Sequence, residues 1–277
     1  MRIHHLNCAT MCPRGARMLS GQGSLLGEAR LVAHCLLIEA GGELVLVDTG
    51  FGTGDAADPK RLGQPFRALV RPRCLEEETA VRQVERLGLD PADVRRIVVT
   101  HLDVDHAGGL GDFPQAEVHV FAPELAASKH PPLRERGRYV AAHTAHNPNW
   151  VEHEVDGDRW FGFESVRLLE DLDVEVAMVP LVGHSTGHSA IAINTPQGWL
   201  LHCGDAYFFR GEVATPPSCP PGLRAFQNIV QHDGKTRRHN QERLRELARD
   251  LRDDVELFCS LDPTEFDRTS IARPESG

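Results

Sequence analysis

Hydrophobic residues occur along this chain in short runs that polar turns separate. Runs of about four to eight apolar residues bounded by Gly, Pro, Asn or Asp are typical of buried β-strands. Gly41 and Gly42 separate two such runs, and a Pro-Gln-Gly turn at 196–198 separates two others, so both pairs predict hairpins. The runs that we expect to form strands are residues 2–6, 31–39, 43–48, 97–99, 116–122, 174–182, 190–194, 198–203 and 255–261.

Two segments have helical spacing instead. In residues 76–87 and 240–251 the apolar positions recur every three or four residues, and the first segment stops at Gly88. Strands therefore dominate each half of the chain, and each half ends with a helix. Two packed sheets with helices outside fit this pattern, because every apolar face is then covered. The pattern alone also allows a parallel α/β sheet.

Residues 123–165 show neither the apolar runs of a strand nor the apolar spacing of a helix. They contain a Pro-Pro pair, a basic cluster (Arg134, Arg136 and Arg138), histidines and tryptophans. Long loops of this composition often form a lid or a pocket wall, and an ordinary surface excursion explains the segment equally well. We expect an insertion that covers the core of a single domain, residues 1–277.

The composition restricts the partners that the protein can have. Of 277 residues, 41% are hydrophobic and 25% charged, which is typical of a globular protein. The net charge of −10 argues against nucleic acid, which is bound mainly by Lys and Arg. No run approaches the roughly 18 apolar residues that span a membrane, and the N-terminus lacks the apolar core of a signal peptide. Seven scattered cysteines predict reduced thiols in a cytoplasmic protein.

The densest group of metal-binding side chains follows the predicted strand 97–99. It comprises His101, Asp103, Asp105 and His106. Alternate residues share one face of an extended chain, so the first three can converge, and the chain must turn for His106 to join them. Imidazoles and carboxylates at this density are the usual ligands of zinc, iron or manganese. The sequence therefore predicts a metal site here, with a polar surface loop as the alternative.

Other polar residues stand just after predicted strands, close to glycines. His184, Asp205 and Asp48 are in such positions. A carboxylate at the end of a buried strand needs hydrogen-bond partners, so Asp48 could cap its loop or orient a metal ligand. His202 points away from the face that Asp205 occupies, and we expect it in the core. We expect His188 to pack or cap the loop after His184.

Four motifs, in this order, span most of the chain. They are Asp-Thr-Gly at 48–50, Thr-His-Leu-Asp-Val-Asp-His-Ala-Gly-Gly at 100–109, Gly-His-Ser-Thr-Gly-His at 183–188 and Gly-Asp at 204–205. This pattern resembles the metallo-β-lactamase-fold hydrolase superfamily, in particular its lactonase-like and glyoxalase-II-like branches, which include the acyl-homoserine lactonases. The resemblance implies an α+β fold, a four-layer αββα sandwich with the site along one edge.

The resemblance also implies a set of ligands for one or two zinc ions. The first ion would bind His101, the residue at position 103 and His184; the second would bind Asp105 and His106; and Asp205 would bridge both. Members of the family complete the second site with a histidine after the final strand. Asp48 would orient a ligand from outside the site.

Two positions depart from the family pattern. Asp103 stands where a histidine is usual; a carboxylate is a harder ligand, which moves the preference toward iron or manganese. Leu261 stands where the last histidine is expected, and leucine cannot bind a metal ion. The adjacent Asp262 could substitute if its loop shifts.

The function that the resemblance implies is hydrolysis of a small ester, lactone or thioester by a metal-activated hydroxide. Asp105 would orient the nucleophile, and Tyr207, or a histidine from residues 143–153, would donate to the oxyanion. Homoserine lactonases carry a tyrosine where this chain has Phe208. The alternatives are a non-catalytic or weakly active member with a degraded second site, and a mononuclear iron enzyme. Whether the protein forms a homodimer stays open.

Overall fold

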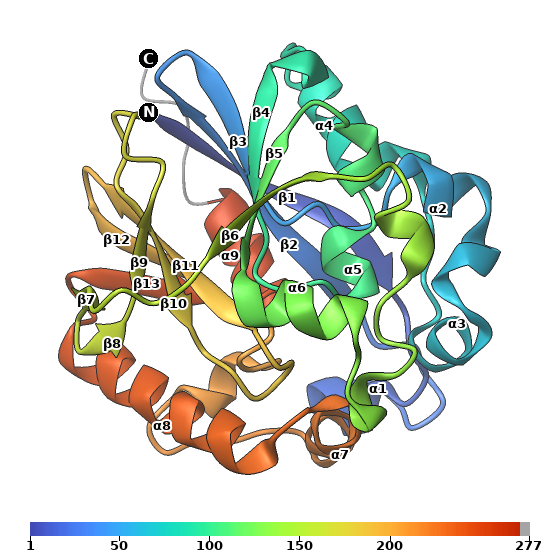
Figure 1. Ribbon diagram of the computed structural model, residues 1–277. Helices are drawn as coiled ribbons and strands as arrows, with labels where there is room; N and C mark the ends of the chain where they lie inside the picture. The colour runs from blue at the N-terminus through green and yellow to red at the C-terminus, as the bar shows by residue number, and fades with distance from the viewer. Residues whose placement is uncertain (272–277) are drawn as a thin grey trace.

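The computed structural model describes residues 1–271, and its centre is a pair of packed β-sheets (Figure 1). In the first sheet β1 to β3 pair antiparallel and β3 to β6 pair parallel. The strand order follows the sequence: β1 (Arg2–Met11), β2 (Leu31–Ala40), β3 (Glu43–Val47), β4 (Val94–Val98), β5 (Glu117–Phe121) and β6 (Asn149–His153).

The second sheet comes from the later half of the chain. Its order is β13 (Val255–Phe258), β12 (Gly198–His202), β11 (Ser189–Thr195), β10 (Val176–Pro180) and β9 (Val166–Leu168). Neighbours are antiparallel except β12 and β13, which are parallel. A separate two-stranded ribbon consists of β7 (Arg159–Trp160) and β8 (Phe163–Glu164).

Helices pack around the two sheets. They are α1 (Ala16–Ser20), α2 (Thr53–Ala57), α3 (Gln64–Val70), α4 (Ala80–Arg86), α5 (Val104–Ala107), α6 (Ala122–Lys129), α7 (Pro221–Val230), α8 (Gly234–Asp250) and α9 (Pro263–Ile271). Val84 of α4 and Leu125 of α6 pack on the first sheet, and Leu244 of α8 packs on the second. The layers are therefore αββα, as expected.

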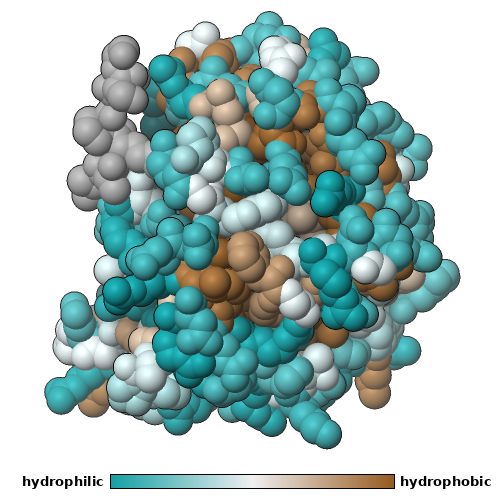
Figure 2. Space-filling view, turned by 90° about the vertical axis from the view of Figure 1, so that its left-hand side faces the viewer, coloured by the Kyte–Doolittle hydropathy of each residue, from teal (hydrophilic) through white to brown (hydrophobic). Residues whose placement is uncertain are grey.

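The core lies between the two sheets. Its members alternate with outward-facing residues along each strand: Leu36 and Ile38 face the other sheet, whereas Leu37 packs under the helices. Both faces of the strands are apolar because both are covered, which explains the continuous hydrophobic runs in the sequence. On the face shown in Figure 2, hydrophobic residues lie between hydrophilic ones.

Some expected boundaries differ from the observed ones. The strand expected at 2–6 extends to Met11, because β1 pairs with β2 as far as Leu31. The helix expected at 240–251 begins at Gly234, where the Asp233 side chain caps it by accepting from the N–H groups of Lys235 and Thr236.

Residues 123–165 contribute more to the layers than we expected. Most of α6 lies in this segment, and β6 extends the first sheet as its edge strand. The stretch between α6 and β6 carries only two short 3₁₀ turns, at Leu133–Glu135 and Ala141–His143. Among the described residues, no helix is long and apolar enough to cross a membrane.

Candidate metal centre

The polar cluster after β4 lies on an extended stretch followed by one helical turn. Asp103 is the N-cap residue of α5, and its carbonyl accepts from the N–H groups of His106 and Ala107 at 3.0 and 2.9 Å. This turn brings His106 back toward His101, so that their ring centroids are 4.0 Å apart. The chain therefore turns where the sequence required it.

The predicted ligand atoms converge at this turn. His184 Nε2 is 3.1 Å and His101 Nε2 is 3.5 Å from Asp103 Oδ2. His106 Nε2 is 4.0 Å from Asp105 Oδ2. Atoms that bind one tetrahedral zinc ion at about 2.0–2.2 Å are roughly 3.4 Å from each other. The observed separations are close to that spacing.

Asp205 lies between His106 on one side and the pair His101 and His184 on the other. Its Oδ2 is 3.5 Å from His184 Nε2 and 4.0 Å from His101 Nε2, whereas its Oδ1 is 3.4 Å from His106 Nε2. Burial opposes ionisation of this carboxyl, but the neighbouring His106 lowers its pKa below the usual value. One carboxylate can therefore serve both groups of ligands, as expected for a bridging residue.

Several of these atoms are buried without a partner. His101 Nε2, His106 Nε2, Asp103 Oδ1 and Asp205 Oδ1 have no hydrogen-bond partner among the described residues. Buried polar atoms are nearly always paired, so four unpaired atoms in one cluster indicate a missing ligand. Imidazole nitrogens with carboxylate oxygens suit zinc, iron or manganese, and the residues present therefore fit a divalent metal ion.

Two neighbouring residues orient the ligands. Asp48 Oδ2 lies 2.8 Å from His106 Nδ1 and also accepts from the Thr100 hydroxyl at 2.8 Å, while its Oδ1 accepts from the Thr100 N–H at 2.7 Å. His188 Nε2 accepts from the backbone N–H of Asp205 at 2.8 Å. A proton on His106 Nδ1 leaves Nε2 as the lone pair that faces the cluster.

Two buried carboxylates near α6 fix the loop that carries His184. Glu124 accepts from Leu102 N at 3.0 Å, Ser185 Oγ at 2.7 Å and Gly187 N at 2.9 Å, and so ties the two ligand loops together. Glu135 accepts from the N–H and the hydroxyl of Thr186, each at 2.8 Å. Burial raises the pKa of Glu124 to about 7.

An arginine also reaches the cluster. Arg138 Nη1 lies 2.5 Å from Asp103 Oδ2 and 2.9 Å from His184 Nε2. Its Nη2 donates to the carbonyls of His184, at 3.2 Å, and of Val230. The side chain of Arg138 is only 8% exposed.

Comparison with known proteins identifies the family. The family model described as "Metallo-beta-lactamase superfamily" matches residues 29–259. The chain belongs to the metallo-β-lactamase superfamily. A probable metallo-hydrolase of Mycobacterium tuberculosis is 43% identical over 264 residues, which cover 95% of this chain and 81% of that protein. The predictions of the fold and of a metallo-hydrolase are therefore confirmed.

Lactonases are among the more distant relatives of this superfamily member. An N-acyl homoserine lactonase of Bacillus thuringiensis is 30% identical over 203 residues, 71% of this chain and 74% of that protein. A solved structure of an N-acyl homoserine lactone hydrolase has a TM-score of 0.72 with 21% identity, covering 96% of this chain and 95% of that one. The structural likeness supports the shared fold.

Leu261 occupies the position where the resemblance led us to expect the last metal-binding histidine, and its surroundings are apolar. Leu261 is 3% exposed and packs in one apolar cluster with Val104 and Phe208. The side chain of the adjacent Asp262 accepts from the backbone N–H of Arg210 at 2.8 Å, from its guanidinium at 3.0 Å and from Thr264 N at 2.8 Å. Asp262 is therefore engaged elsewhere, and its expected use as a substitute ligand has no support from these contacts.

Three of the expected oxyanion donors, Tyr207, His143 and His153, are engaged elsewhere. The Tyr207 ring is buried in the core between the second sheet and α8, and its hydroxyl donates to Glu265 at 3.2 Å. These contacts give no support to the expected catalytic role of Tyr207, because the chain turns after β12 and directs the ring into the core. His143 pairs with Asp55 at 3.0 Å, and His153 with His119 at 3.0 Å.

Three residues of the site were not found from the sequence. Glu124, Glu135 and Arg138 contact the ligand loops from a segment without apolar periodicity. The basic cluster around Arg138 was the one feature that set this segment apart. Nothing local in the sequence indicated that its third arginine turns inward.

Proposed function

We propose that this protein is a metal-dependent hydrolase of a small ester, lactone or thioester. The observation that carries the proposal is the position of Asp205, whose two oxygens face different histidines within 3.4–4.0 Å. A single carboxylate between two groups of unpaired ligand atoms suits a centre for one or two divalent ions. The relatives named as metallo-hydrolase and as lactonase support the same class of reaction.

Each residue of the cluster has a role in this proposal. His101, Asp103 and His184 would hold the first ion, Asp105 and His106 the second, and Asp205 both. A bound divalent ion supplies a hydroxide near neutral pH, by lowering the pKa of water to about 7, and polarises a carbonyl oxygen. The Asp105 carboxylate would orient the attacking water. Burial raises the pKa of the Asp105 carboxyl to about 7.

Leu261 supports a second candidate. The second ion would have Asp105, His106 and Asp205 as its only protein ligands, because leucine offers no lone pair. A fold member with one tightly bound ion and little or no hydrolytic activity is the alternative. Asp103 adds a carboxylate to the first site, which keeps iron and manganese beside zinc as candidate ions.

Hydrolysis can be tested with a substrate panel. Protein purified without chelators is supplied with zinc, manganese or iron and assayed for proton release from aryl esters, γ-lactones and acyl thioesters. We expect turnover of at least one class, and loss of that turnover in His101→Ala. His119→Ala is the matched control, since it removes a buried histidine outside the cluster. Equal rates in both variants would contradict the proposal.

The metal content separates the two candidates. Elemental analysis of the wild type and of Leu261→His gives the number of ions per chain. Two equivalents in the wild type favour the bimetallic hydrolase. One equivalent that rises to two in Leu261→His would show that the leucine limits the second site, and gained hydrolysis in that variant would identify the wild type as a degraded member.

A further inference from the structure

Arg138 is the one residue at the centre whose contacts the proposed reaction leaves unexplained. It comes from the stretch between α6 and β6, and two backbone carbonyls, those of His184 and Val230, hold its Nη2. These contacts fix the plane of the guanidinium. Its Nη1 is thereby directed at Asp103 Oδ2 and His184 Nε2, at 2.5 and 2.9 Å.

The contact with His184 conflicts with metal binding. Nη1 carries two hydrogens, and Asp103 Oδ2 and His184 Nε2, which lie 3.1 Å from each other, are the two groups within hydrogen-bond distance of it. The single lone pair of His184 Nε2 can accept this hydrogen bond or bind a metal ion, but it cannot do both. A guanidinium keeps its protons in proteins. Once His184 serves as a ligand, one N–H of a buried cation therefore loses its acceptor.

A buried charged donor without an acceptor is unfavourable, because it has lost its hydrogen bonds to water without replacing them. The group that best satisfies it is an anionic oxygen, because hydrogen bonds between a guanidinium and a carboxylate are among the strongest in proteins. Hydrolysis of an ester or lactone breaks the acyl C–O bond, adds the oxygen of water to the acyl carbon, and releases an alcohol, a carboxylate and a proton. A carboxylate is thus formed beside this N–H.

We propose that Arg138 is a substrate-binding residue that recognises the carboxylate formed by hydrolysis at the metal centre. This inference rests on the proposed function. It assigns to Arg138 the anion contact that Tyr207 cannot make, since the hydroxyl of Tyr207 is bound to Glu265. Asp103 keeps its contact with the guanidinium through Oδ2, and its Oδ1 has no partner among the described residues.

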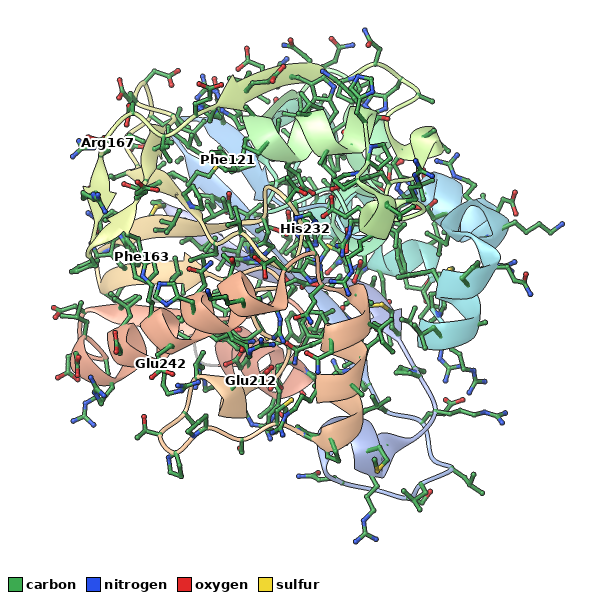
Figure 3. All side chains as sticks on the ribbon, turned by 60° about the horizontal axis from the view of Figure 1, so that its bottom comes forward. Phe121, Phe163, Arg167, Glu212, His232 and Glu242 are labelled. Carbon is green, nitrogen blue, oxygen red and sulfur yellow. The ribbon has the colours of Figure 1, made fainter. Side chains whose placement is uncertain are left out.

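The surroundings of Arg138 also favour anions. The chain has a net charge of −10, yet Arg134 and Arg138 lie within five residues. Glu135, the acidic residue among them, is buried and bound to Thr186. Arg134 donates to the carbonyl of His232 at 3.3 Å, and the N–H of His232 donates to the carbonyl of His184 at 2.8 Å. His232 is labelled near the middle of Figure 3, and its contacts place Arg134 and Arg138 beside the loop that carries His184.

The test measures anion binding without turnover. The dissociation constant of acetate is determined by NMR titration of ¹³C-labelled acetate with zinc-loaded wild type, Arg138→Gln, Arg138→Lys and Arg136→Gln. We expect Arg138→Gln to weaken acetate binding about tenfold, the effect of one charge-assisted hydrogen bond. Arg138→Lys should lose less, because it keeps the charge. Arg136→Gln, an exposed change in the same segment, should bind as the wild type does.

Zinc content is measured on the same samples. Acetate binding that is unchanged in Arg138→Gln would overturn the inference. So would a loss of zinc that accounts for the weaker binding, because Arg138 would then only position Asp103. If no ester is hydrolysed but Arg138→Gln loses acetate, the proposed reaction is wrong and the anion site stands. If hydrolysis is found and acetate binds all variants equally, the reaction stands and the anion site is wrong.

Discussion

The contact between Asp48 and His106 gives a prediction whose size follows from the geometry. The two oxygens of Asp48 meet three donors: the N–H and hydroxyl of Thr100 and Nδ1 of His106. In Asp48→Asn the amide oxygen can still accept from the Thr100 N–H. The amide NH₂ would then face the other two groups.

The hydroxyl of Thr100 can rotate and become an acceptor, but His106 cannot adapt without a change of tautomer. If Nδ1 accepts from the new amide, the proton of the neutral ring moves to Nε2, the atom that faces Asp205 at 3.4 Å. That atom is then no longer available to a metal ion. Loss of such an orienting contact typically weakens metal binding 10–100-fold, or about 1.4–2.7 kcal/mol.

The assay is a zinc titration against a chromophoric chelator, with ¹⁵N NMR of the histidine side chains to report the tautomer of His106. Asp55→Asn is the matched control, because Asp55 pairs with His143 at 3.0 Å in another buried carboxylate–histidine contact. We expect weaker zinc binding in Asp48→Asn alone. Unchanged affinity in Asp48→Asn, or an equal loss in Asp55→Asn, would refute the reasoning.

Two further predictions concern stability. Glu124→Ala removes the acceptor of three buried hydrogen bonds and should lower the free energy of unfolding in urea by roughly 3–5 kcal/mol. The same change at the exposed Glu154 should have little effect. Equal losses in the two variants would show that Glu124 does not join the two ligand loops. Burial raises the pKa of Glu265 from 4.5 to about 7. Between these values the folded protein holds a proton that the unfolded chain has lost, so the free energy of unfolding should fall by up to about 3 kcal/mol as the pH rises through this window. Urea titrations across that range should show a flatter profile for Glu265→Gln, and parallel profiles would exclude Glu265 as the source.

Much of the fold could be predicted because strands covered on both faces leave long apolar runs in the sequence. The candidate metal ligands could be predicted for a related reason: His101, His184 and Asp205 each follow such a run, so each is positioned by a rigid strand. The turn at His106 was predicted because alternation alone could not bring it to the other ligands.

The remainder depends on contacts between distant parts of the chain. Glu124 reaches Ser185 and Gly187, and Arg138 reaches His184, across stretches of sequence whose spacing carries no information about proximity. The catalytic role of Tyr207 was expected from the resemblance to the lactonases, which carry a tyrosine at the next position, and the contacts of Tyr207 do not support that role. The backbone turns between Asp205 and Tyr207, and only the packing against α8 determines where the ring goes.

The candidate ligands come from both sheets. His101 and His106 follow β4 of the first sheet, while His184 and Asp205 follow β10 and β12 of the second. An ion shared by them would act as a removable crosslink between the two halves of the sandwich, stabilising the folded state in proportion to its affinity. Chelation would then do more than stop turnover. It would weaken the contact between the two halves. Backbone near that contact would then be cleaved by proteases and would exchange its amide hydrogens faster than in the metal-loaded protein.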